Sequence, residues 1–288
     1  MARHLLSCSL FALAACAARP AVIEPVRQGY RFMTGDVLRY RVVSHLSVDT
    51  KGTHPTFLTK GITRPLLWDL EGEFDNVVLG VGESGDARIE RRVRDLDSSG
   101  RWQDEMFGLA WNREKDGAAP DENGTQNAMD GFAAQMIAMP LKFRVNGQGI
   151  SVTEELLSNR LVLRRGMMYW PIRPGEASWE STEEIAVPIL HDKIRLTFVN
   201  SIADRNGTVV RIIAPVSFKE KTEVKAGDGV VYVVSGGAAA QFDESCGRLK
   251  KLELDLRIQY SGKASVAGGG VGDIKGVVTY IEKQTLIE

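Results

Sequence analysis

The strongest constraint on the fold is a two-residue alternation of apolar and polar side chains. It is clearest over residues 252–260, where apolar side chains alternate with charged or amide-bearing ones. The apolar set is Leu252, Leu254, Leu256, Ile258 and Tyr260. Successive side chains of a strand point to opposite faces, so this spacing predicts a strand with one packed and one wet face. Such strands are typical of antiparallel sheets, because the strands of a parallel sheet are buried on both faces.

The alternation recurs over residues 38–42, 66–74 and 194–198, and a last strand is expected over 277–281. Glycine is frequent, at 29 of 288 residues, which suits a turn-rich β protein. We therefore predict a mainly β (α+β) fold, with curved antiparallel sheets built from hairpins and one or two helices packed on a sheet face.

Three short turn sequences separate these apolar runs and predict β-hairpins. Asn206-Gly207 is the strongest of the three signals, because Asn-Gly favours the tight turn that joins two antiparallel strands. The glycine-containing stretches from Gly82 to Asp86 and from Asp243 to Gly247 predict two further hairpins.

One segment, residues 126–139, has helical rather than strand periodicity. Its apolar residues are Met129, Phe132, Ala133, Met136 and Ile137. This spacing puts them on a single stripe of a helix, and Pro140 fits the helix end. A second helix is expected over 153–160.

The apolar stripe of this helix has two interpretations. Methionine-rich helix faces adapt to varied apolar ligands, which makes the stripe a candidate lipid-binding surface. A helix on an antiparallel sheet also has to bury such a stripe, which makes the same residues core. The candidate ligand-binding residues are Met129, Phe132, Met136 and Ile137.

The N-terminus has the layout of a secretory signal peptide. The apolar run from Leu5 to Leu13 is far shorter than the ~20 residues that a membrane-spanning helix needs. Small residues follow at Ala14 and Ala15. We therefore predict that residues 1–15 are removed on export and take no part in the fold.

The sequence Leu13-Ala14-Ala15-Cys16 resembles the lipobox of bacterial lipoprotein precursors. The resemblance implies cleavage before Cys16 and a lipid anchor on it, with fatty acids such as palmitate holding the protein on a membrane. Ordinary signal cleavage within Ala15-Cys16-Ala17 is the alternative. Ala17 stands where Asp favours inner-membrane retention in enteric bacteria, so the resemblance favours the outer membrane, facing the periplasm, over the inner membrane or the cell surface.

These features predict the organisation of the chain. We expect a signal peptide over 1–15, a lipidated cysteine and tether over 16–31, a first β-rich half over 32–150, a connection over 151–170 and a second β-rich half over 171–288. A weak similarity between the two openings, Gly35–Tyr40 and Pro174–Trp179, supports the hypothesis that the halves are similar.

Composition excludes some functions. Lys and Arg number 36 against 37 Asp and Glu, a net charge of −1, whereas dedicated nucleic-acid binders carry a basic excess. We therefore expect no nucleic-acid partner. After loss of Cys8 and lipidation of Cys16, only Cys246 remains, which excludes an intramolecular disulfide.

The sequence offers few candidates for catalysis or metal binding. The mature chain has His45, His54 and His191, without an H-x-x-x-H or C-x-x-C spacing, so we predict no metal, no cofactor and no catalytic residues. Gly80-x-Gly82-x-x-Gly85 matches the dinucleotide fingerprint formally. A charged segment without a helical stripe follows it, so we interpret it as a turn.

The strand-rich body, with its A-x-F-D…G-R-L hairpin over 240–249, resembles uncharacterised bacterial lipoproteins and, more loosely, the lipoprotein-carrier and lipid-carrier folds. The leading hypothesis is a lipid-anchored envelope protein, not an enzyme, that binds or scaffolds an envelope protein, glycan or lipid. The alternative is a carrier of an apolar or lipid ligand in a concave sheet. The third hypothesis is a hydrolase of envelope polymers that uses His191 or His45 with a carboxylate from another strand.

Overall fold

The computed structural model describes most of the chain after residue 23. The described ranges are 24–52, 66–102, 105–120, 128–138, 140–151, 169–187, 192–216, 229–266 and 270–287. The strands are β1 (Val37–Gly52), β2 (Leu66–Val81), β3 (Ala87–Trp102), β4 (Glu105–Asn112), β5 (Leu141–Val145), β6 (Ser178–Val187), β7 (Asp192–Asn206), β8 (Val209–Pro215), β9 (Val231–Asp243), β10 (Arg248–Val266) and β11 (Gly270–Leu286). The helices are α2 (Arg113–Asp116) and α3 (Ala128–Ala138).

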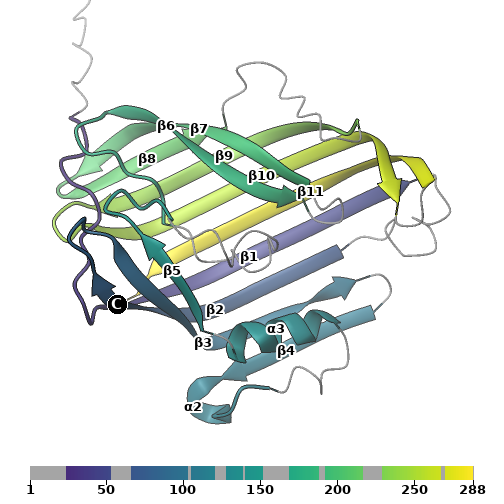
Figure 1. Ribbon diagram of the computed structural model, residues 1–288, viewed down its shortest axis with the longest axis horizontal. Helices are drawn as coiled ribbons and strands as arrows, with labels where there is room; N and C mark the ends of the chain where they lie inside the picture. Colours follow the sequence, from purple (N-terminus) through teal and green to yellow (C-terminus); the bar gives the residue numbers. More distant parts are fainter. Residues whose placement is uncertain are drawn as a thin grey trace, which may run out of the picture.

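All of these strands form one open, curled antiparallel sheet (Figure 1). The strand order is β4-β3-β2-β1-β11-β10-β9-β8-β7-β6, and β5 pairs with β3 beside β4. The first strands run outward from the middle of the sheet to one edge, and the later strands return from the other edge. The first and last strands therefore pair with each other at the centre, which confirms the predicted mainly β, antiparallel fold.

The predicted alternation and hairpins are confirmed. The apolar residues of the 252–260 run are all buried on one face of β10. The three turn sequences join β2 to β3, β7 to β8 and β9 to β10. Gly207 has a positive φ of 60°, a conformation that a residue without a Cβ adopts readily.

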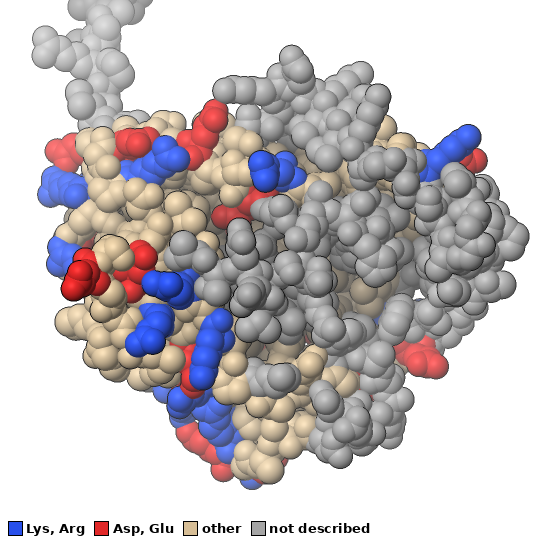
Figure 2. Space-filling model, in the orientation of Figure 1, with Lys and Arg blue, Asp and Glu red and all other residues tan. Residues whose placement is uncertain are grey.

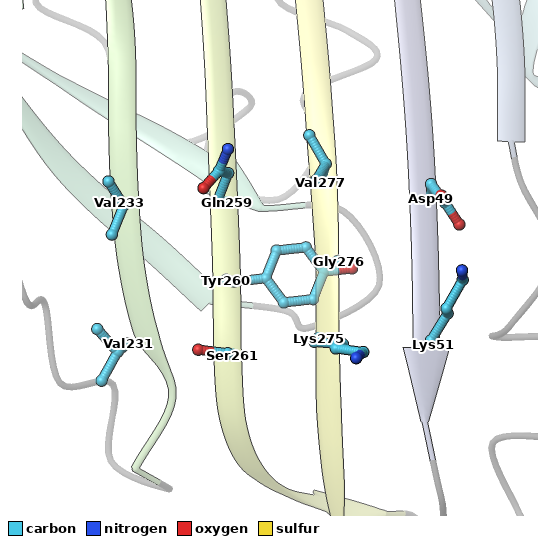
Figure 3. Close-up of a pocket in the computed structure, with 10 residues that line it drawn as sticks. All are labelled: Asp49, Lys51, Val231, Val233, Gln259, Tyr260, Ser261, Lys275, Gly276 and Val277. Carbon is cyan, nitrogen blue, oxygen red and sulfur yellow. The ribbon is translucent and has the colours of Figure 1, made fainter.

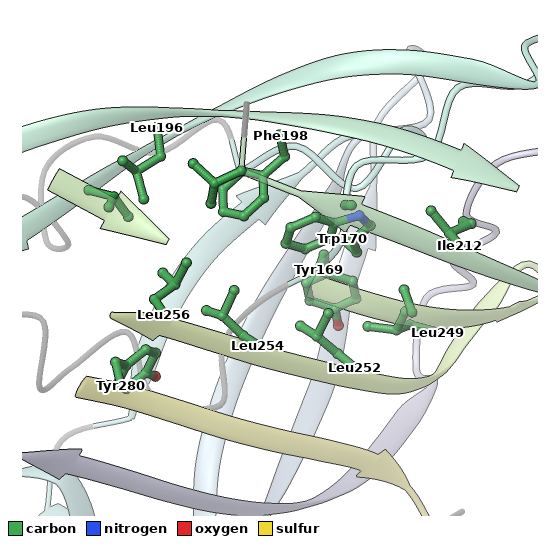
Figure 4. Packing of buried hydrophobic residues seen from close by; sticks show 14 of the residues in the cluster. Tyr169, Trp170, Leu196, Phe198, Ile212, Leu249, Leu252, Leu254, Leu256 and Tyr280 are labelled. Carbon is green, nitrogen blue, oxygen red and sulfur yellow. The ribbon is translucent and has the colours of Figure 1, made fainter. Parts of the chain in front are cut away.

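The inner face of the sheet carries one large hydrophobic cluster to which both runs of strands contribute (Figure 4). Two coil segments contribute side chains to it: Val26 and Tyr30 from one, and Tyr169, Trp170 and Ile172 from the other. The Tyr30 hydroxyl donates to the Trp170 carbonyl at 2.9 Å. The predicted tether over 16–31 therefore does not continue to residue 31, because Val26 is fully buried.

Helix α3 confirms the helix predicted over 126–139. It packs on β3 and β4, over a second hydrophobic cluster. The buried members are Val42, Leu70, Phe74, Val93, Leu96, Trp111, Ala133 and Ile137. The helix predicted over 153–160 lies outside the described residues.

The two runs of strands, β1–β5 and β6–β11, fall within the ranges predicted for the two halves. They share the large core cluster, which has members from 46 to 145 and from 179 to 280. Most of the predicted connection over 151–170 lies outside the described residues. The similarity of the halves stays a prediction.

Candidate functional site

A hollow of about 420 Å³ opens on the outer face of the sheet, over four adjacent strands (Figure 3). Two rows of side chains across β9, β10, β11 and β1 form most of its lining. The first row is Val233, Gln259, Val277 and Asp49, and the second is Val231, Ser261, Lys275 and Lys51. Each row follows from strand register, because residues of one parity share one face.

Two lysines of the second row lie directly opposite each other, since Lys51 of β1 pairs with Lys275 of β11. Like charges in this position destabilise a sheet. The other cations of β1 contact carboxylates of β2. Arg39 lies 2.9 Å from Asp75, and Arg41 pairs with Glu71. Among the described residues, neither lysine has a carboxylate oxygen within 4.0 Å.

A second hollow of about 540 Å³ adjoins the first and shares Lys51, Ser261 and Lys275 with it. It adds a third ammonium group, Lys263 of β10, and the carboxylate of Asp273. Lys263 and Asp273 are direct cross-strand partners on β10 and β11, although no ion pair within 4.0 Å joins them. We call the two hollows together the lysine hollow, a surface at one end of the sheet where three lysines gather, none of them with an ion pair among the described residues.

A tyrosine and a glycine form the floor of the lysine hollow. On the inner side, the Tyr260 hydroxyl hydrogen bonds to the Thr50 hydroxyl, and burial raises the pKa of Tyr260. A Cβ at Gly276 would lie 2.4 Å from that tyrosine oxygen and 2.4 Å from the Asp49 carbonyl oxygen. The absence of a side chain at position 276 therefore lets the ring bridge three strands and fix the floor.

The opposite side of the lysine hollow is apolar. Val233 of β9 is 51% exposed, and Val231 and Val277 are half-buried. The lining thus changes across the strands, from valines on β9, through the neutral polar Gln259 and Ser261 of β10, to Val277 and Lys275 on β11 (Figure 3). On β1 it consists of Asp49 and Lys51, so a carboxylate lies beside the lysines.

Charges are mixed on the face of the molecule shown in Figure 2, where basic and acidic side chains are interspersed over the described part. This pattern agrees with the near-zero net charge of the chain.

Among the described residues, one cation is buried in the interior, Arg91 of β3. It is 4% exposed, and its guanidinium carbon lies 4.3 Å from the centre of the Phe74 ring. Burial lowers the pKa of this guanidinium to about 10, although the negative charge of Glu282 opposes the shift. We assign Arg91 and Glu282 to the core, because both residues are buried.

The structure places some of the predicted ligand-binding residues in the core. Ile137 is 6% exposed and belongs to the second hydrophobic cluster, against which Met136 is packed. The side chains of Met129 and Phe132 and the whole of Cys16 lie outside the described residues. Lipid binding by this stripe and lipidation of Cys16 stay predictions.

Of the two histidines named in the hydrolase hypothesis, the structure describes only His45. His45 Nδ1 lies 2.7 Å from Asp69 Oδ1, across β1 and β2 on the outer face. This pair joins a histidine to a carboxylate of another strand, and the hydrolase hypothesis stays a prediction. His54 and His191 lie outside the described residues. Cys246 is half-buried and lies in the turn between β9 and β10, where its thiol is 3.8 Å from the Asp243 carbonyl oxygen.

Searches of the described residues found neither a group of metal-binding side chains nor a helix that is long and apolar enough to span a membrane. Comparison with family models found no match, and comparison with curated proteins found none either. Among solved structures, the chain is similar to one described as lipid-protein interactions in lipovitellin. The TM-score is 0.45 and the identity 11%, and the match covers 90% of this chain and 26% of that one. The chain thus spans about a quarter of that structure's length.

The lysine hollow has no signature in the local sequence pattern. The alternation predicts that Lys51, Lys263 and Lys275 face outward, but their juxtaposition depends on pairing between β1 and β11, at opposite ends of the chain. The sequence indicates only that each of these lysines lies near the end of a strand and at a position whose side chain points outward.

Proposed function

We propose that the protein is a lipid-anchored, non-catalytic binding protein of a bacterial envelope and that it holds an anionic ligand in the lysine hollow. The observation that carries the proposal is the direct opposition of Lys51 and Lys275 without a carboxylate partner among the described residues. An anion between the two ammonium groups would replace their repulsion with two favourable interactions.

The first described residues of the chain and the lysine hollow lie toward different ends of the sheet. Arg31 donates its backbone N–H to the carbonyl of Gly247, in the turn before β10, whereas Lys263 lies near the other end of β10. Strand β1 has 16 residues and spans about 50 Å between these ends. A membrane attachment through Cys16 would therefore leave the lysine hollow free to meet a ligand at a distance from the point of attachment.

Metabolic labelling tests the anchor. Cells that express the full chain and are fed radiolabelled palmitate should label the protein, and Cys16→Ser should abolish the label and release the protein into the soluble fraction. Equal labelling of both chains contradicts lipidation of Cys16.

Native mass spectrometry tests the binding role. The full chain with Cys16→Ser, exported to a bacterial periplasm, should carry a non-covalent adduct that leaves on denaturation. The adduct should be lost from a Lys51→Gln/Lys275→Gln variant. It should remain with Lys283→Gln, a control that removes a charge from the outer face of the same strand as Lys275. An empty parent chain, or an adduct that survives the paired substitution, contradicts the proposal.

A further inference from the structure

The lysine hollow combines two chemically different surfaces within the reach of one small ligand. The valines of β9 and the lysine of β1 are separated by three strand spacings, about 14 Å at ~4.8 Å each. Lys51 and Lys275 lie at one side of this span and Val231 and Val233 at the other. A ligand that matches both sides needs an anionic group and an apolar group on one molecule.

The basic side favours phosphate over carboxylate. Lysine acts as a compact point charge with rotatable donors, which suits the several oxygens of a phosphate, whereas planar bidentate recognition of carboxylates favours arginine. Every cation that lines the lysine hollow is a lysine, and Ser261 adds a hydroxyl donor between them and the valines.

The apolar side requires more than an inorganic anion. Val233 leaves 51% of its surface exposed, beside the half-buried Val231 and Val277. Removal of apolar surface from water contributes about 0.8 kcal/mol per methylene group, so a short hydrocarbon chain lying on these valines adds measurable affinity.

We infer that the ligand of the lysine hollow is an amphiphile whose phosphate group gives it a net negative charge. Its phosphate contacts Lys51, Lys275 and Lys263, and its hydrocarbon part lies against the valines of β9 and β11. This inference rests on the proposed function and adds to it the chemical class of the ligand.

Isothermal titration calorimetry with the full chain carrying Cys16→Ser tests the inference. The probes are inorganic phosphate, a short-chain phosphatidylglycerol and a phosphatidylcholine of the same chain length, each below its micelle concentration. Phosphatidylglycerol should bind at least about tenfold more tightly than inorganic phosphate, the equivalent of about 1.4 kcal/mol. It should also bind at least about tenfold more tightly than phosphatidylcholine, whose head group has no net charge.

Substitutions test the apolar and the basic side of the lysine hollow separately. Val233→Ser should weaken phosphatidylglycerol binding severalfold and leave phosphate binding unchanged. The Lys51→Gln/Lys275→Gln pair should abolish binding of both anions, and the Lys283→Gln control should alter neither. Circular dichroism of each variant confirms that the fold is retained.

The outcomes test the amphiphilic ligand separately from the proposed anion-binding function. If inorganic phosphate binds as tightly as phosphatidylglycerol, the amphiphile is wrong and a free anion is the ligand, so the anion-binding function stands. If phosphatidylcholine binds as tightly as phosphatidylglycerol, the role of the lysines is overturned. If none of the probes binds, the inference fails, and the adduct experiment decides the fate of the proposed function separately.

Discussion

Replacement of Asn200 by alanine tests whether the inside of the curled sheet is a packed, hydrogen-bonded core. Asn200 lies on β7 and is fully buried. Its Oδ1 accepts a hydrogen bond from the Trp170 indole at 2.7 Å, and its Nδ2 donates to the Ser181 hydroxyl at 2.9 Å and the Trp179 carbonyl at 3.2 Å. One amide side chain thus connects the coil over 169–172 to two strands.

The expected loss of stability follows from the hydrogen bonds that the substitution removes and from the buried donor that it leaves without a partner. A buried donor without a partner costs about 1–3 kcal/mol, and each lost hydrogen bond contributes about 0.5–1.5 kcal/mol. Asn200→Ala orphans the Trp170 indole N–H and removes the bond to Ser181. We expect the free energy of unfolding to fall by about 2–4 kcal/mol in urea titrations followed by circular dichroism.

A double-mutant cycle provides the control. Trp170→Phe removes the indole donor, so the cost of Asn200→Ala should be about 1–2 kcal/mol smaller in that background. Additivity within about 0.5 kcal/mol, or a single-substitution effect below that value, would refute the reasoning. Either result would mean that the indole does not depend on Asn200, and that the interior is looser than the packed core described above.

Three further predictions concern the stability of the fold. Burial raises the pKa of Tyr169 to about 12, so stability should fall between pH 10 and 12, where tyrosine in the unfolded chain ionises first. Tyr169→Phe should reduce that loss by about 2–3 kcal/mol, measured by urea unfolding at both pH values, and an unchanged alkaline loss would contradict the assignment. Gly236 has a φ of 115°, and its added Cβ would lie 2.0 Å from the Asp255 carbonyl oxygen, so Gly236→Ala should lower the melting temperature or prevent folding. An unchanged melting temperature of the Gly236→Ala variant in calorimetry would contradict this, because it would mean that β9 shifts to make room for the added Cβ at little cost. Ile137→Ala should destabilise the protein by about 2–5 kcal/mol with no change in lipid affinity, whereas a ligand-binding stripe predicts a loss of affinity instead.

Local pattern made much of the sheet predictable. The alternation over 252–260 identified β10 and its buried face, because burial on one side of a strand constrains every second residue. Asn206-Gly207 located a hairpin through its turn chemistry, and the helical spacing over 126–139 located α3. In each of these cases, the residues that determine the local structure are close together in the sequence.

Features that depend on contacts between distant parts of the chain could not be predicted from the sequence. The contact between β1 and β11 joins residues more than 200 positions apart, and nothing in either strand specifies its partner. The lysine hollow depends on that contact, so it could not be predicted. The burial of Val26 and Tyr30 was also missed, because the prolines and the lack of periodicity before Arg31 indicated a tether. Packing inside the curled sheet decides their position instead.

Lysine footprinting is the most direct test of the claim that the lysine hollow holds an anionic ligand. The full chain with Cys16→Ser is treated briefly with an acetylating reagent, with and without saturating short-chain phosphatidylglycerol, and modification is measured at each lysine by mass spectrometry. The account predicts that the ligand slows acetylation of Lys51 and Lys275 severalfold and leaves Lys283 unchanged. Unchanged acetylation of Lys51 and Lys275 while the lipid is bound would contradict it.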